Sequence, residues 1–120
     1  MTATAISGDV AVVRLEERDD LRESLVTAVA AGRHVVLDLA GVRTIDPDAL
    51  AVLVRARQQI RQEADGWLCL AAPSRLVLTV LHTMRLERAF PTFADSPSAL
   101  AWLAEGAGAE APAPLWVGSA

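Results

Sequence analysis

The sequence has 120 residues, a length that suits one domain with a single core. Apolar residues make up 52% of the chain, too many for a disordered protein, and a net charge of −4 argues against a nucleic-acid-binding surface. No secretion signal is recognisable, and no apolar run approaches the ~20 residues that span a membrane. We therefore expect a cytoplasmic protein without direct membrane insertion, whose single cysteine, Cys69, is a buried thiol.

The first predicted elements are two strands separated by one helix. A first strand is predicted over 10–15 and a helix over 20–31, ended by Gly32. The apolar face of this helix, by its spacing, consists of Leu21, Leu25, Val26 and Val29. The next strand, 34–39, is apolar except for Asp38, as is typical of a parallel strand that helices cover on both faces.

The segment after this strand predicts a helix that begins at Pro47 and runs to about Glu63. Asp46 is a preferred N-cap, and proline is preferred at the first helical position because the amide hydrogen that it lacks would have no partner there. Asp48 falls in the first turn, where the helix dipole favours an anion. One side of the helix is mostly apolar, and Arg57 on that side is expected to cover the core edge with its stem and to reach water with its head. The opposite side is polar and includes Arg55, Gln58 and Gln62.

The second half of the chain continues the alternation. Strands are predicted at 67–72 and, as a short edge strand, at 90–93. Ser74 is predicted to cap a helix over 75–84, and Ser96 to cap a last helix over 97–105. Strands alternating with helices predict an α/β fold, in which helices pack against a sheet. Residues 106–120 are rich in alanine, glycine and proline and predict a flexible tail, so the domain is expected to comprise residues 1–105.

A family resemblance accompanies this pattern over roughly residues 8 to 105. An apolar strand that ends in Asp-Leu, a following valine, a loop aspartate and then a helix are matched by Asp38, Leu39, Val42, Ile45, Asp46 and Leu50. Downstream matches lie at Leu81, at 86–90 and at 98–100. The chain resembles the STAS domain family, which includes anti-sigma-factor antagonists and the cytoplasmic tails of sulphate transporters. The resemblance implies a mixed β-sheet of about four to five strands with about four helices packed against it.

The chain departs from this family at the position where regulation takes place. In the anti-sigma-factor antagonists, the residue directly after the loop aspartate is the serine that a partner kinase phosphorylates. That position is Pro47 here, which has no hydroxyl group, and Asp48 places a fixed charge one residue further on. A carboxylate carries one charge, whereas phosphoserine carries about −1.5 to −2. Thr44, just before the loop, could serve as a substitute phosphate acceptor, although a threonine at a strand end usually has only a β-forming role. Arg85 stands where a helix-ending glycine is common.

The sequence offers no set of residues suited to catalysis. Asp46 and Asp48 are both assigned to the helix start, where they would not converge on a substrate, and neither a Ser-His pair nor a Cys-His pair has supporting spacing. There is also no metal-ligand cluster and no glycine-rich phosphate loop. We therefore predict that the protein is not an enzyme and requires no cofactor.

The resemblance implies a bacterial signalling protein that regulates transcription by binding another protein. The expected partner is an anti-sigma factor of the serine-kinase type, and nucleic acid is not expected as a partner. The predicted partner-binding residues are Arg43, Thr44, Asp46, Pro47 and Asp48 in the 43–50 loop, and Arg55 and Gln58 on the following helix. Two alternatives remain open: a cytoplasmic STAS subunit of a lipid-importing ABC transporter, and a self-associating module that forms a homodimer.

Overall fold

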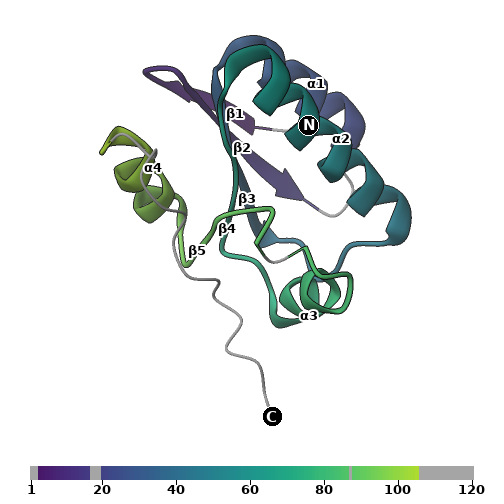
Figure 1. Ribbon diagram of the computed structural model, residues 1–120. Helices are drawn as coiled ribbons and strands as arrows, with labels where there is room; N and C mark the ends of the chain where they lie inside the picture. Colours follow the sequence, from purple (N-terminus) through teal and green to yellow (C-terminus); the bar gives the residue numbers. More distant parts are fainter. Residues whose placement is uncertain (1–2, 17–19, 87, 106–120) are drawn as a thin grey trace.

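The computed structural model describes residues 3–16, 20–86 and 88–105, and within these ranges a five-stranded sheet is combined with four helices (Figure 1). The strands are β1 (Ala3–Ser7), β2 (Val10–Glu16), β3 (His34–Gly41), β4 (Leu68–Ala71) and β5 (Thr92–Phe93). The helices are α1 (Leu21–Ala31), α2 (Pro47–Ala64), α3 (Arg75–Thr83) and α4 (Ser96–Ala104). The predicted α/β fold with a mixed sheet is confirmed. The predicted tail at 106–120 lies outside the described residues.

The N-terminal strand β1 corrects the prediction that the sheet begins with residues 10–15. β1 pairs antiparallel with β2, and the pair Ser7–Val10 closes a two-residue turn at Gly8-Asp9. Gly8 has a φ of 62° at the first central position, where glycine is typical of a type II′ hairpin turn. The sequence prediction treated Gly8-Asp9 as the boundary of a strand, because the small residues of β1 give a weak strand pattern.

The order of the strands determines which face each helix covers. The sheet order is β1-β2-β3-β4-β5, and β2 to β5 pair in parallel. Right-handed crossovers between parallel strands that advance in one direction place all connecting helices on the same face. Accordingly α1, α2 and α3 contribute to one apolar cluster with the sheet, whereas α4, which follows the last strand, packs on the other face (Figure 1).

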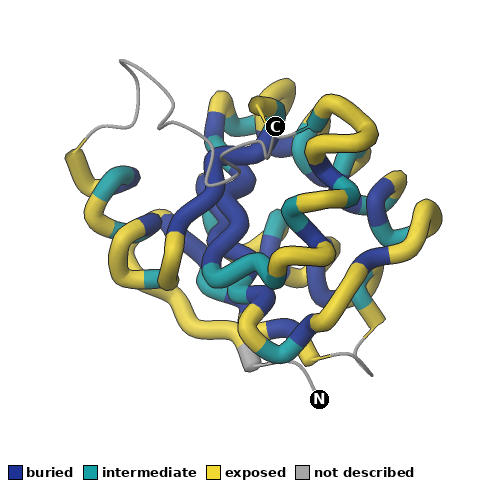
Figure 2. The backbone as a smooth tube through the Cα atoms, turned by 90° about the horizontal axis from the view of Figure 1, so that it is seen from below, coloured by how far each residue is buried: buried dark blue, intermediate teal, exposed yellow. Residues whose placement is uncertain are grey.

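The sheet separates two cores of different size. The strand segments at the centre of the molecule are buried, and exposed residues lie mainly in loops and on the outer faces of helices (Figure 2). The larger core, beneath α1 and α2, includes the fully buried Leu37, Leu53 and Phe90. The smaller core, beneath α4, includes Cys69 and Phe93. Its outer part is an aromatic group, in which the ring centroid of Trp102 lies 5.3 Å from that of Trp67 and 5.6 Å from that of Phe93.

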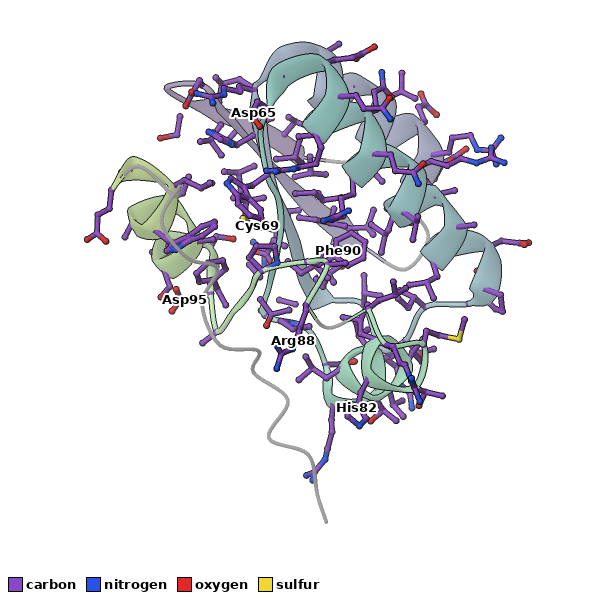
Figure 3. The ribbon with its side chains drawn as sticks, in the orientation of Figure 1. Asp65, Cys69, His82, Arg88, Phe90 and Asp95 are labelled. Carbon is purple, nitrogen blue, oxygen red and sulfur yellow. The ribbon has the colours of Figure 1, made fainter. Side chains whose placement is uncertain are left out.

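Cys69 is buried as predicted, on the side of β4 that faces α4 (Figure 3). Burial raises the pKa of its thiol to about 12, because the thiolate would lose its hydration. The thiol therefore stays protonated near neutral pH and serves as a small apolar side chain.

One prediction about a helix face is wrong. Val26 was placed on the apolar face of α1, but it is 65% exposed, and the buried residues of that helix are Ser24, Leu25 and Ala28. On α2, Arg57 is half-buried, and its Nε donates a hydrogen bond of 2.6 Å to the carbonyl oxygen of Ala89. This bond ties α2 to the segment that precedes β5.

The helix ends follow local hydrogen-bonding rules, with one more correction. The cap of α4 is Asp95, not Ser96: its Oδ1 accepts a 2.8 Å hydrogen bond from the amide of Ser98 (Figure 3). Ser74 caps α3 as predicted, by accepting from the amide of Val77. Arg85 ends α3 with a φ of 58°, so the position at which a glycine is common does adopt the left-handed conformation that glycine favours.

Candidate functional site

The loop between β3 and α2 is held to the domain by two buried side chains. Val42 and Ile45 are 7% and 8% exposed and belong to the larger core. The amide of Val42 donates to the carbonyl oxygen of Leu39, and the hydroxyl of Ser74 donates to the carbonyl oxygen of Arg43. The loop backbone is therefore fixed by both β3 and the start of α3, while its polar side chains face outward.

The start of α2 has the predicted capping arrangement. Asp46 has extended backbone angles, and its Oδ1 accepts a 2.7 Å hydrogen bond from the amide of Ala49. Pro47 occupies the first turn, where its fixed φ suits the helix and no amide hydrogen is needed. Asp48 adds a carboxylate to the same turn. This arrangement leaves the side chains of Pro47 and Asp48 exposed at the surface of a preordered turn.

The seven predicted site residues are all exposed, and most of them lie together. Five of them form one continuous surface from the loop into the first turn of α2: Arg43, Thr44, Asp46, Pro47 and Asp48. Arg55 and Gln58 lie two to three turns further along α2. The loop and α2 therefore present one elongated surface, which is a geometry suited to binding another protein.

A groove opens beside this loop, between the first turns of α1 and α2. Its volume is about 420 Å³. Leu15, Leu21, Val42, Ile45, Ala49 and Val52 supply apolar lining. Polar lining comes from Glu16, Asp20, Arg22, Thr44, Asp46 and Asp48. Four carboxylates against one guanidinium give the lining of this groove a net negative charge near neutral pH.

A second hollow of about 200 Å³ extends the first one along the same two helices. Leu25, Val26, Val29 and Ala56 line it together with Arg55 and Gln59, and it shares Arg22 and Val52 with the first. The two hollows are adjacent, because both are bordered by Arg22 and Val52. We call the combined surface the α1–α2 groove, and it is lined by the residues named for the two hollows.

The sequence prediction missed the side of this groove that α1 contributes. Glu16, Asp20 and Arg22 come from the segment around the start of α1, more than twenty positions before the loop. Val26 gave no signal in the sequence, because only the packing shows that this residue is exposed. Sequence spacing alone assigned that residue to the core.

Among the described residues, no group of three or more His, Cys, Asp and Glu side chains is arranged to hold a metal ion. Within the same ranges, no helix is both long enough and apolar enough to cross a membrane. The carboxylate of Asp46 is engaged as a helix cap, and the thiol of Cys69 is buried and protonated. What the site presents is an ordered, exposed and charged surface.

Comparisons with known proteins agree with this architecture. The sequence model of the STAS domain matches residues 6–99. The solved structure of an anti-sigma-factor antagonist (STAS) domain protein from Planctomyces limnophilus is similar with a TM-score of 0.75 and 20% identity, over 86% of this chain and 97% of that one. An anti-sigma factor antagonist from Mycobacterium paratuberculosis is similar with a TM-score of 0.69 and 19% identity, over 84% of this chain and 91% of that one.

A third solved structure, the anti-sigma factor antagonist SpoIIAA in its unphosphorylated form, has a TM-score of 0.66 and 16% identity, over 88% of this chain and 97% of that one. At these identities the likeness concerns the fold. A search of curated proteins found no match.

Proposed function

The chain belongs to the STAS domain family, and we propose that it acts as a non-catalytic antagonist of an anti-sigma factor of the serine-kinase type. In this proposal the 43–50 loop and the exposed side of α2 dock on the anti-sigma factor and displace the sigma factor from it. Membership in the family and the anti-sigma-factor antagonists among its structural relatives support the proposal.

The observation that carries the proposal is the ordered, exposed turn at Asp46, Pro47 and Asp48. By the family resemblance, Pro47 corresponds to the serine that is phosphorylated in the anti-sigma-factor antagonists. Pro47 keeps the backbone of a helix start and removes the acceptor hydroxyl. The protein would therefore be an antagonist that the kinase activity of its partner cannot turn off at this position.

The binding free energy would come mainly from apolar contacts around the loop, with the charged side chains setting specificity and association rate. Asp48 supplies one charge where phosphoserine would supply about −1.5 to −2, so its effect is weaker than that of a phosphate group. Because the loop backbone is already ordered by Val42, Ile45 and Ser74, binding would cost little additional conformational entropy.

The test uses the full chain, its Pro47→Ser variant and a matched Pro47→Ala control. The partner is first recovered by affinity purification of the tagged chain from its native cells, and binding is then measured by calorimetry with and without ATP. ATP should weaken the binding of Pro47→Ser only, since only that variant acquires a hydroxyl group at the switch position. Absence of any kinase-type anti-sigma factor that binds any of the three forms would refute the proposal.

The same purification tests the second candidate, a STAS subunit of a lipid-importing ABC transporter. The lack of a phosphorylatable serine favours this candidate, because a transporter subunit needs no such switch. Recovery of ATPase and permease subunits from the membrane fraction would replace the first proposal. Pro47 and Asp48 would then have only the role of helix-start residues.

A further inference from the structure

We propose that the α1–α2 groove receives an amphipathic helix of the partner, oriented antiparallel to α1 and α2, with basic residues in its last turn. This inference deepens the proposed function, because it names the structural element of the partner and the direction in which it lies. It rests on three features of the groove: its length, its apolar lining and the uneven distribution of its charges.

The groove has the length and direction needed for a helix. α1 and α2 both begin at the carboxyl ends of parallel strands and both lie on the same face of the sheet, so they run in the same direction. The lining residues on α2 extend from Asp48 to Gln59, which corresponds to about 17 Å at the ~1.5 Å rise of a helix. A partner helix of three to four turns would fill this length.

The lining of the groove provides an apolar strip for such a helix. Leu21, Val29, Ala49 and Val52 are half-buried along the seam between the two helices. Val26 projects further, with 65% of its surface exposed. An apolar strip between two helices is the usual receptor for the apolar face of a third helix, which presents its residues at i, i+3, i+4 and i+7.

The charges of the groove determine the orientation of the partner helix. Glu16, Asp20, Asp46 and Asp48 gather at the end of the groove where α1 and α2 begin. The other end carries Arg55 and Gln59, and Arg22 lies between the two ends. Basic residues of the partner would therefore lie over the loop, and acidic residues near Arg55.

The helix dipoles favour the same orientation. The amino ends of α1 and α2 carry partial positive charge, whereas the carboxyl end of a helix carries partial negative charge. An antiparallel partner helix brings its carboxyl end to those two amino ends. Basic side chains are also favoured in the last turn of a helix. The partner helix's own dipole and the acidic end of the groove therefore both favour basic residues in its last turn.

The test uses two synthetic amphipathic peptides of about 12 residues, a length that matches the groove. Both have the same composition and the same solvent-facing hydrocarbon staple, which raises the helix content of both peptides. Circular dichroism measures the difference in helix content that the two charge orders leave, and the affinities are compared after correction for it. One carries arginine in its last turn and glutamate in its first, and the other carries the reverse. We expect the first peptide to bind the full chain about tenfold more tightly. Backbone amide shifts should change at the groove-lining positions.

Two substitutions locate the contact. Val26→Asp places a charge on the apolar strip and should weaken the binding of the first peptide by tenfold or more. Leu76→Asp is the matched control, because Leu76 is 53% exposed on α3 and outside the groove, and it should leave binding unchanged. Asp48→Lys should reduce or reverse the preference between the two peptides. All three positions are exposed, and circular dichroism checks that the variants fold.

Several outcomes would overturn the inference. These are equal binding of the two peptides, failure of both to bind, and shift changes that fall outside the groove. If the amide chemical shifts of the groove-lining residues change with protein concentration, the groove binds a second copy of the chain. If Trp116→Ala changes the amide chemical shifts of the groove-lining residues in the absence of peptide, the groove binds the chain's own C-terminal segment.

The result is separable from that of the proposed function. If the purified anti-sigma factor binds Val26→Asp as tightly as the unchanged chain, the groove is not its docking site, although the proposed function stands. If no anti-sigma factor binds at all while the first peptide is selected in the expected direction, the groove is a helix-binding site for another partner.

Discussion

The starts of α2 and α4 have the same local chemistry and different surroundings. Each begins with an aspartate cap whose Oδ1 accepts from an amide three residues later, at 2.7 Å from Ala49 and 2.8 Å from Ser98. Each also has a proline in its first two positions. At α4, however, the residue after the cap is Ser96, whose hydroxyl donates to Oδ2 of Asp38 at 3.2 Å.

At α2 the corresponding residue is Pro47, which is exposed, and its neighbours Asp46 and Asp48 line the α1–α2 groove. The Ser96 hydroxyl beside the cap of α4 thus forms a hydrogen bond within the domain, whereas the first turn of α2 is exposed at the surface. A capping motif therefore identifies a helix start, and the neighbouring elements decide whether that start is structural or available for binding.

Among these predictions, replacement of the buried apolar residue just before each helix should change the free energy of unfolding the most. Ile45 and Phe93 are each 8% exposed and lie just before α2 and α4. Substitution by alanine should lower the free energy of unfolding by about 2–5 kcal/mol for Ile45 and about 3–5 kcal/mol for Phe93, because each leaves a cavity. Urea denaturation measures both losses.

The two anchor variants should differ in their effect on the groove. Amide spectra at a temperature where both variants remain folded should show shifts of the groove-lining residues for Ile45→Ala only, since Phe93 packs in the core on the other face of the sheet. Equal perturbation of the groove by both variants would contradict the distinction between the two helix starts.

Removal of the α2 cap should have an intermediate effect. Asp46→Ala should lower the free energy of unfolding by about 1 kcal/mol, because the amide of Ala49 loses its acceptor. Asp46→Asn should retain most of the stability, since asparagine is also a good cap. If Asp46→Ala and Asp46→Asn unfold at the same urea concentration, the carboxylate does not act as a cap.

The contact of Ser96 with Asp38 should give a smaller effect, which a double-mutant cycle isolates. Ser96→Ala and Asp38→Ala, alone and together, should reveal a coupling free energy of about 0.5–1.5 kcal/mol, the range for one typical hydrogen bond. The same cycle between Pro47 and Asp38 is the control and should give no coupling. A coupling near zero for Ser96 and Asp38 would show that the hydroxyl is not held inside the domain.

The smallest expected effect is a change of stability with pH at the α4 start. Hydrogen bonding from Ser98 holds the pKa of Asp95 below its usual value. The stabilisation is therefore fully present above the unfolded-state pKa of about 3.9 and is lost as the pH falls through the lower folded-state pKa.

Urea denaturation of the unchanged chain and Asp95→Asn from about pH 6 to pH 2 measures this loss. The difference between the two proteins should shrink toward low pH. Comparison within the pair cancels the contribution of His34, whose pKa is lowered by burial. A difference that grows as the pH falls would contradict the assigned direction.

The limits of sequence prediction are seen at particular residues. Helix starts at Asp46 and Ser74 were predicted correctly, because capping depends on atoms three residues apart. The cap of α4 was predicted one residue too late, because aspartate and serine are both good caps. Only the tertiary structure shows that the Ser96 hydroxyl instead donates to Asp38. The strand β1 was missed because its identity depends on pairing with β2 rather than on its own pattern.

The sequence alone determined the α/β class, the parallel central strands, the ordered turn at Pro47 and its lack of a hydroxyl group. These follow from periodicity, capping and side-chain chemistry, which act over a few residues. Only the tertiary structure decided that Glu16 and Asp20 lie beside Asp48, that Val26 is exposed and that α1 and α2 enclose a groove. The physical reason is that right-handed crossovers place two helices, far apart in the sequence, side by side on one face of the sheet.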